Sequence, residues 1–119
     1  MQLAEYMRLQ YPQVLFRSDL GGVRLSPGLR MRMARLQSGR SWPDFFVAYP
    51  SHGYHGLFIE IKKPNTKIYT NKMQLVANPH IRAQYAMLQH LFTLGYQAQF
   101  GVGFERCKVL VDGYLGAPL

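Results

Sequence analysis

Cysteine and acidic residues are the scarcest chemical groups in this chain of 119 residues. Its one cysteine, Cys107, cannot form a disulfide bond within the chain. A scaffold of internal disulfides is therefore excluded, and we expect a reducing compartment such as the cytoplasm. Six Asp and Glu residues stand against fourteen Lys and Arg residues, which gives a formal net charge of +8. A field of this sign attracts polyanions, and nucleic acid is the commonest polyanion for a basic domain.

Long apolar runs are also missing, although hydrophobic residues make up 48% of the chain. The longest runs are far too short to cross a bilayer. The first residues lack the basic-then-apolar pattern of a signal peptide. Charged residues make up 17% of the chain, a composition typical of a protein with a core rather than a disordered tail. We expect a single domain over residues 1–119, because this length leaves little room for a second core.

The basic residues are unevenly distributed along the chain. The segment from Val23 to Arg40 has five arginines and no acid, and the charged residues from Ile61 to Phe104 are all basic. Such stretches are typical of surfaces that bind nucleic-acid phosphates, and the alternative is a solvated basic surface that binds none. The expected nucleic-acid-binding residues are Arg24, Arg30, Arg32, Arg35, Arg40 and Lys63.

Hydrophobic periodicity predicts an alternation of helices and strands. The predicted helices are Leu3–Gln10, Leu29–Gln37, His80–Leu94 and Glu105–Tyr114. The predicted strands are Val14–Arg17, Phe45–Tyr49, Leu57–Lys62 and Tyr96–Val102. The two central strands are joined by a turn-rich link, which predicts an antiparallel hairpin, whereas Pro64 to Pro79 is expected to be irregular. The order predicts an α/β fold in which helices flank a mixed sheet.

Two helices have a predicted apolar face. In the second helix this face consists of Leu29, Met33 and Leu36. In the third helix it consists of Ile81, Tyr85, Leu88 and Phe92.

The strongest chemical signal is Pro43-Asp44, followed on the next strand by Glu60-Ile61-Lys62. Strand side chains alternate, so Glu60 and Lys62 share one face. In a hairpin the start of one strand lies beside the end of the next, which brings Asp44 to this pair. Crowded carboxylates repel each other, and a hard cation such as Mg²⁺ or Mn²⁺ relieves that repulsion. The pattern therefore predicts a site for phosphodiester hydrolysis, in which Lys62 orients or activates water or stabilises phosphate charge.

Less specific interpretations of these residues stay open at this point. A Glu-x-Lys pair at a strand end is often an exposed salt bridge, and Pro-Asp often only opens a turn. The four histidines and Cys107 lack the spacing of zinc ligands. A basic structural protein without nuclease activity is a further alternative.

Further segments flank the acidic pair in a recognisable order. They are Gly39-Arg40-Ser41-Trp42-Pro43-Asp44-Phe45, Gly56-Leu57-Phe58-Ile59-Glu60-Ile61-Lys62-Lys63-Pro64, Gln84 in the long helix, and Leu94-Gly95-Tyr96. Glu5 and the stretch from Phe16 to Gly22 precede them. Together they resemble the VRR-NUC domain, the virus-type replication-repair nuclease branch of the PD-(D/E)xK superfamily. The resemblance covers nearly the whole chain.

The resemblance implies a restriction-endonuclease-like core and a role for each matching residue. Asp44, Glu60 and the backbone carbonyl of Ile61 would hold the metal, and Lys62 would be the catalytic lysine. Glu5 would assist the metal directly or through water; the alternative is a solvated acid favoured by the helix dipole. Gln84 is similar to the family's helix glutamine, and the alternative is an amide that bonds the backbone.

The resemblance also implies an activity, a partner and a setting. Standalone members of the family are associated with homodimers and branched DNA, including four-way (Holliday) junctions. We therefore expect a Mg²⁺- or Mn²⁺-dependent DNA endonuclease of phage or prophage origin in the cytoplasm of a bacterial host. The alternative is a non-enzymatic nucleic-acid-binding module on the same fold. The expected dimer interface is the first helix or the last helix, the latter through Cys107, Leu110 and Tyr114.

Overall fold

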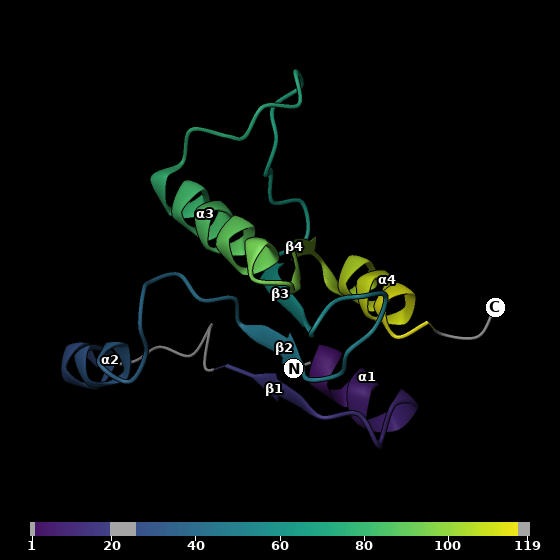
Figure 1. Ribbon diagram of the computed structural model, residues 1–119. Helices are drawn as coiled ribbons and strands as arrows, with labels where there is room; N and C mark the ends of the chain where they lie inside the picture. Colours follow the sequence, from purple (N-terminus) through teal and green to yellow (C-terminus); the bar gives the residue numbers. More distant parts are fainter. Residues whose placement is uncertain (1, 20–25, 117–119) are drawn as a thin grey trace.

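A four-stranded mixed sheet forms the centre of the computed structural model, which describes residues 2–19 and 26–116 (Figure 1). Its strands are β1 (Phe16–Ser18), β2 (Phe45–Val47), β3 (Leu57–Lys62) and β4 (Gln97–Val102). The helices of the described residues are α1 (Gln2–Gln10), α2 (Pro27–Ala34), α3 (Pro79–Thr93) and α4 (Phe104–Tyr114). The predicted α/β class, with a mixed sheet flanked by helices, is confirmed.

The strands lie in the sheet in the order in which they occur along the chain, β1-β2-β3-β4. β1 pairs with β2, and β2 with β3, in antiparallel orientation, so the predicted central hairpin is confirmed. β4 runs parallel to β3. Parallel neighbours need a crossover connection rather than a tight turn, and α3 provides it.

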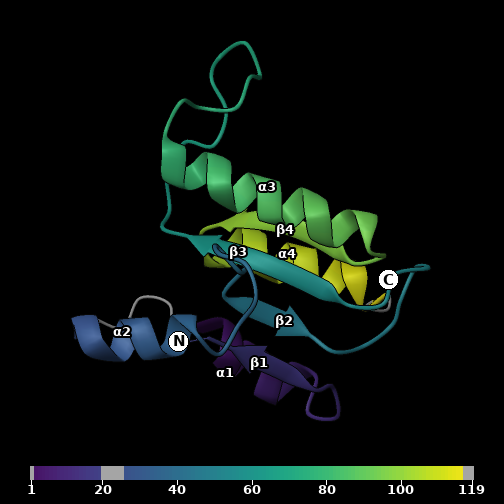
Figure 2. The same ribbon diagram turned by 60° about the vertical axis from the view of Figure 1, so that its left-hand side comes forward.

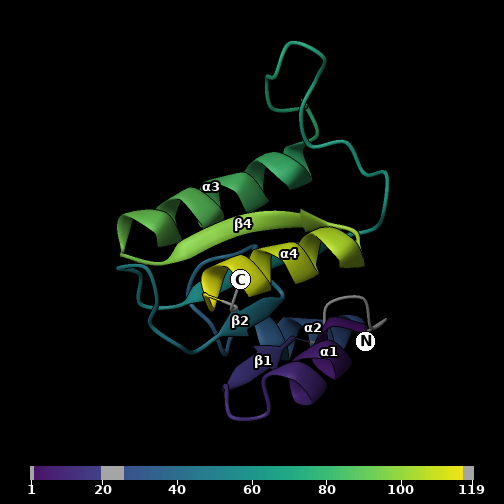
Figure 3. The same cartoon turned by 90° about the vertical axis from the view of Figure 1, so that its right-hand side faces the viewer.

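Helices cover both faces of the sheet. α3 lies along one face, whereas α4 and α1 lie on the other (Figures 2 and 3). The main core is on the side of α4, where alternate residues of β2 and β3 point inward, as the two-residue period of a strand requires. This core consists of Leu3, Met7, Phe45, Val47, Leu57, Ile59, Cys107, Val111 and Tyr114.

α4 packs closely against Gly101 of β4. A Cβ atom at this position would lie 2.5 Å from the sulfur of Cys107 and 2.8 Å from Cγ2 of Ile59, so a larger residue does not fit without movement. The Cys107 thiol donates a hydrogen bond to the Gly101 carbonyl, and burial raises the pKa of this thiol to about 11. Cys107 is therefore a packing residue that holds α4 against β4.

α1 and α4 are tied together by a polar cluster. Asp112 of α4 accepts hydrogen bonds from the hydroxyl groups of Tyr6 and Tyr11, both at 2.7 Å. Cys107 and Tyr114 are buried in the core of the same chain. The prediction that this side of α4 forms a subunit interface is therefore wrong, because its apolar residues already pack against α1 and the sheet.

The buried face of α3 differs in part from the predicted stripe. Its buried residues are Ile81, Gln84, Leu88 and Leu91. This set has the same helical spacing as the predicted one but is turned around the axis, so Tyr85 is only half-buried. Phe92 is exposed, and its ring lies 6.1 Å from the ring of Tyr54 in the link between β2 and β3. The prediction of Phe92 as a core residue is wrong.

α2 stands apart from the rest of the molecule (Figures 1 and 2) and buries none of its residues. It begins after Ser26, whose hydroxyl accepts a hydrogen bond from the Leu29 amide at 3.2 Å. The prediction that Leu29, Met33 and Leu36 form a core-facing side is wrong, since Leu29 and Leu36 are exposed. None of the helices in the described part of the chain is both long enough and apolar enough to span a membrane.

Candidate active site

The hairpin of β2 and β3 brings Asp44 and Glu60 together. Phe45 pairs with Ile59 in antiparallel register, and one further step of that register places Asp44 opposite Glu60. Directly opposite residues of an antiparallel pair have Cβ atoms about 4.5–5.5 Å apart, and like charges at such positions are destabilising. The two carboxyl groups are therefore close neighbours and repel each other when both are ionised.

Glu60 is buried, with only 6% of its surface exposed, whereas Asp44 is half-buried. Burial, and then the nearby charge of Asp44, raise the pKa of Glu60 from 4.5 to about 8. Burial also raises the pKa of Asp44, although the hydrogen bond from the Ile61 amide opposes the shift. Without a cation, Glu60 thus keeps its proton near neutral pH and can donate it in a hydrogen bond to Asp44.

The backbone of Ile61 also faces this pair. Its amide donates a hydrogen bond to Oδ1 of Asp44 at 2.8 Å. The next carbonyl, that of Lys62, accepts a bond from Gly103 on the opposite side of the strand, at 2.8 Å. The N–H and C=O groups of one strand residue point to the same side, and those of successive residues alternate. The Ile61 carbonyl therefore points toward the side of Asp44.

Asp44 lines two hollows. A cleft of about 980 Å³ opens at the end of β3, and its walls include Asp44, Ile61 and Lys62. A second hollow of about 580 Å³ lies between the sheet and α2, with Asp44, Trp42 and Asp19 in its lining. Asp44 is therefore accessible although the carboxyl pair is largely buried.

Asp19 and Glu105 are residues near the site that the sequence analysis does not single out. The Asp19 amide donates to the Asp44 carbonyl at 2.8 Å, and the charge of Asp19 contributes to the raised pKa of Glu60. Glu105, in the first turn of α4, lines the cleft beside Lys62. The sequence feature that could have identified Asp19 is its position directly after β1, the strand that pairs with β2. Glu105 has no comparable signal, because only the packing of α4 brings it there.

Glu5 is not brought to the carboxyl pair. Its side chain is exposed and forms an ion pair with Arg8 of the same helix at 2.8 Å. The residues of α1 that reach the cleft are Gln2 and Leu3. A role of Glu5 at the metal stays a prediction that this arrangement does not support.

Gln84 lies on the buried face of α3 with 6% of its surface exposed. Its amide nitrogen lies 3.2 Å from Nε2 of His80, and its carbonyl oxygen is buried without a hydrogen-bond partner among the described residues. An unsatisfied buried polar atom costs about 1–3 kcal/mol, so such groups are often kept for a ligand or water. The alternative of an amide that bonds the backbone is not what the structure shows, since the bond goes to a side chain.

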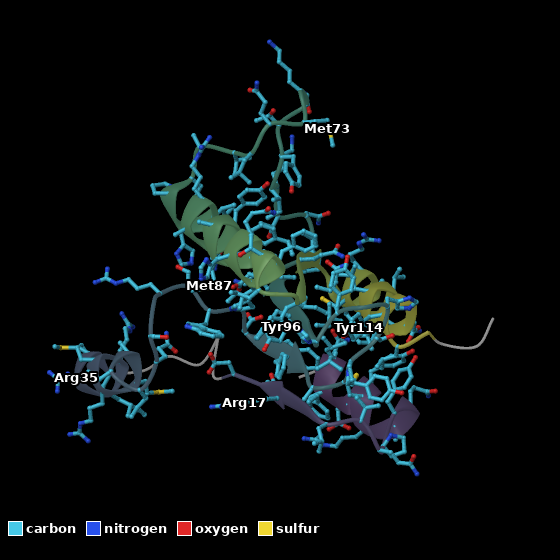
Figure 4. All side chains as sticks on the ribbon, in the orientation of Figure 1. Arg17, Arg35, Met73, Met87, Tyr96 and Tyr114 are labelled. Atoms are coloured by element: carbon cyan, nitrogen blue, oxygen red, sulfur yellow. The ribbon has the colours of Figure 1, made fainter. Side chains whose placement is uncertain are left out.

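The described members of the predicted nucleic-acid-binding set lie in two places, on and after α2 and at the end of β3. Arg24 lies outside the described residues. Arg30 and Arg32 on α2, Arg35 at its end and Arg40 beyond it are all exposed, and Figure 4 shows Arg35 on this outlying helix. Lys63 lines the cleft next to Lys62.

The donor set at the end of β3 consists of two carboxyl groups and one backbone carbonyl. Among the described residues, no three His, Cys, Asp or Glu side chains are arranged to hold a metal ion. Mg²⁺ usually keeps several water molecules and takes one or two carboxylates, so two carboxyl groups fit it. A structural zinc site, with four protein ligands, does not fit.

Comparison with known proteins gives a structural match but no match by sequence. None of the protein-family models matches the chain, and no curated protein does. A solved structure described as "VRR_NUC domain protein" is similar, with a TM-score of 0.58 and 26% sequence identity. The match covers 78% of this chain and spans 66% of the length of that protein. With its four-stranded mixed sheet and flanking helices, the chain has the VRR-NUC fold, which is a nuclease-type fold.

Proposed function

We propose that this chain is a divalent-metal-dependent DNA endonuclease that hydrolyses phosphodiester bonds. The observation that carries the proposal is the buried pair of Asp44 and Glu60 beside Lys62. Two carboxyl groups opposite each other on neighbouring strands cost stability at neutral pH, and groups whose pKa is raised in this way cluster at functional sites. The nuclease-type fold and the net charge of +8 support the same conclusion.

Asp44, Glu60 and the carbonyl of Ile61 would hold Mg²⁺ or Mn²⁺, and water and substrate oxygens would complete its coordination. When bound, the ion supplies Lewis-acid polarisation of the scissile phosphate and lowers the pKa of its bound water. The Ile61 amide keeps Asp44 oriented through the bond at 2.8 Å. Glu60 would have to be ionised to hold the ion, so the positive charge of the ion would favour loss of the proton that the raised pKa otherwise keeps on this carboxyl group.

Lys62 is the charged side chain best placed to act on the substrate. It lines the cleft, and its positive charge opposes the rise in the pKa of Glu60, so it lies near the carboxyl pair. Its ammonium group can stabilise the negative charge that develops on the phosphate, and it can orient the attacking water. These roles need a phosphate at the wall of the cleft that Lys62 and Asp44 share.

The exposed arginines of α2 would bind the DNA backbone beside this site. Met33 of α2 lines the hollow that also contains Asp44, so the helix flanks the site. An eight-residue helix that buries none of its residues gains little stability from packing. Phosphate contacts through Arg30, Arg32 and Arg35 would give this helix a bound partner.

The proposal extends to the substrate and assembly that the family resemblance implies: branched DNA such as four-way junctions, cut by a homodimer in the cytoplasm of a bacterial host. Productive cleavage of a junction needs two incisions on opposing strands. One carboxyl pair makes one incision, and a two-fold dimer supplies the second site in the symmetry of such a junction.

Incubation with labelled linear, flap and four-way DNA in Mg²⁺, Mn²⁺ or EDTA tests this function. We expect cleavage with either metal and none in EDTA, with the four-way substrate cut fastest. Binding without cleavage under every metal condition would identify a non-enzymatic nucleic-acid-binding module instead.

A further inference from the structure

Residues 64–78 form an arm that leaves the sheet directly after Lys62 and Lys63 and returns to the body at α3. Figures 1 and 3 show the arm extending beyond α3, and Figure 4 shows Met73 near its tip. Ile68 is buried and anchors the base of the arm, whereas Met73 is 77% exposed. The first two residues of the arm line the cleft together with Lys62, so the arm adjoins that cleft.

The arm has a defined backbone rather than an open loop. The Val76 amide donates to the Ile68 carbonyl at 3.0 Å, which joins its two sides. The guanidinium group of Arg82 in α3 donates to the carbonyls of Val76 and Leu75 at 3.0 and 3.2 Å. These bonds connect the returning side of the arm to α3.

A cavity of about 600 Å³ lies between the arm, α3, β4 and the first turn of α4. Its polar lining residues include Thr66, Lys67, Tyr69, Gln89, Gln99 and Arg106. The described residues that line it include no Asp or Glu. Two cations, one contributed by the arm and one by α4, thus face a space where nothing in the lining neutralises them.

This cavity adjoins the candidate active site. Val102, at the end of β4, lines both the cavity and the cleft. It is also the register partner of Lys62 across the parallel pair of β3 and β4. A strand of DNA whose phosphate lies at Lys62 can therefore continue past Val102 into the cavity beneath the arm.

We propose that this cavity binds an unpaired stretch of the substrate DNA, next to the bond that is cut. In this inference, which rests on the proposed function, a base stacks on the ring of Tyr69. Lys67 and Arg106 neutralise the phosphates on either side. The substrate class is then DNA with a single-stranded segment at the cleavage site, as in flaps and opened junctions.

The chemistry of the cavity favours an unpaired strand over a duplex. Binding of single strands combines cationic grooves with aromatic rings on which bases stack. Bases inside a duplex are already stacked on one another and offer no free face to a protein ring. Tyr69 is 45% exposed at the edge of the cavity, so its ring is available to an incoming base.

The test compares the affinity of a short labelled oligothymidylate with that of a duplex of equal length, in EDTA to prevent cleavage. We expect Tyr69→Ala to weaken binding of the oligothymidylate about 5- to 150-fold, the usual loss for one stacked ring, and to change duplex binding by less than about twofold. Tyr69→Phe keeps the ring and should restore the affinity. For the oligothymidylate, the logarithm of the binding constant falls linearly with the logarithm of the salt concentration. Arg106→Ala should make this slope shallower by about 0.7, the value for one lost phosphate contact on a single strand.

Lys108→Ala is the matched control for Arg106→Ala. It removes one positive charge from the same helix, but Lys108 lies over the ring of Tyr6, on the side of α1. It should leave the binding of the oligothymidylate unchanged. Equal losses on single strand and duplex in Tyr69→Ala, or no loss on either, would overturn the assignment of the cavity.

The two proposals fail separately in this design. Binding in EDTA does not depend on catalysis, so a protein that cuts no DNA could still bind the oligothymidylate through Tyr69. Conversely, if the protein cuts DNA and Tyr69→Ala binds single strands normally, the cavity does not bind the unpaired strand, but the proposed nuclease function still holds.

Discussion

Asp44 accepts a hydrogen bond at 2.8 Å from the amide of Ile61, a residue of the strand opposite it in the hairpin. The backbone pairing of β2 with β3 extends to Phe45 and Ile59, and beyond it the Asp44 side chain occupies the place of a strand carbonyl. Asp44 is therefore both a candidate metal ligand and the acceptor that completes the hairpin.

This dual role separates two substitutions of Asp44. Asp44→Asn keeps an oxygen that can accept from Ile61, whereas Asp44→Ala leaves the Ile61 amide without it. We expect Asp44→Ala to have a lower free energy of unfolding than Asp44→Asn by about 1–3 kcal/mol. Urea denaturation in EDTA measures the difference. Equal stabilities would mean that water replaces the carboxylate at no cost.

Glu60→Gln should change how stability depends on pH. In the folded protein the pKa of Glu60 is raised to about 8 from its ordinary value of 4.5. The stability contributed by the protonated carboxyl is therefore complete below pH 4.5 and is lost progressively up to about pH 8. Glutamine does not ionise, so the variant does not suffer this loss.

Unfolding free energies of the two proteins, measured in EDTA from pH 4 to 9, test this expectation. The unfolding free energy of the variant minus that of the wild type should grow by up to about 1.4 kcal/mol per pH unit between pH 4.5 and 8. Above pH 8 this difference should stay constant. Parallel curves across this range would mean that Glu60 ionises as an ordinary exposed carboxyl does.

The central hairpin and its acidic pair could be predicted from sequence because both depend on local rules. Alternation along β3 and the turn before it are enough to bring Asp44 to Glu60. Asp19 depends on the register of β1 with β2, which residues distant in sequence determine. The rotation of α3 that buries Gln84 and Leu91, and exposes Phe92, depends likewise on packing against the sheet.

The same limit explains the errors at the surface. The apolar spacing in α4 predicts a buried side, but it cannot tell a subunit interface from packing against α1. The spacing of Leu29, Met33 and Leu36 is helical, yet none of the three is buried in the described structure. The cavity beneath the arm is lined by four separate segments, so no local sequence pattern predicts it.

The arginines of α2 should determine DNA affinity rather than cleavage. Arg30, Arg32 and Arg35 are exposed on a helix that flanks the site. Each substitution by Ala should weaken binding to all DNA sequences alike. The slope of the logarithm of the binding constant against the logarithm of the salt concentration should become shallower by about one unit per lost phosphate contact. Fluorescence anisotropy at several salt concentrations measures the slope, and Lys108→Ala serves as the charge-matched control. An unchanged slope in the triple variant would make these arginines ordinary surface residues.

The proposed homodimer should form without DNA and strengthen with salt. Two subunits of charge +8 repel each other, and salt screens this repulsion. Sedimentation at micromolar protein concentration and several salt concentrations should show a dimer that becomes more populated as salt rises. A strict monomer that still cuts both strands of a four-way junction in one encounter would contradict this assembly.

The catalytic role of the carboxyl pair and Lys62 is best measured by single-turnover cleavage in Mn²⁺ at saturating DNA, in the wild type, Lys62→Ala and Glu60→Gln. We predict that Lys62→Ala lowers the cleavage rate about 10²–10⁴-fold, the usual loss for one positioned catalytic group, while its DNA affinity in EDTA stays within about twofold of the wild type. Glu60→Gln should be inactive and folded. A normal rate in either variant would contradict the assignment of Asp44, Glu60 and Lys62 as the catalytic centre.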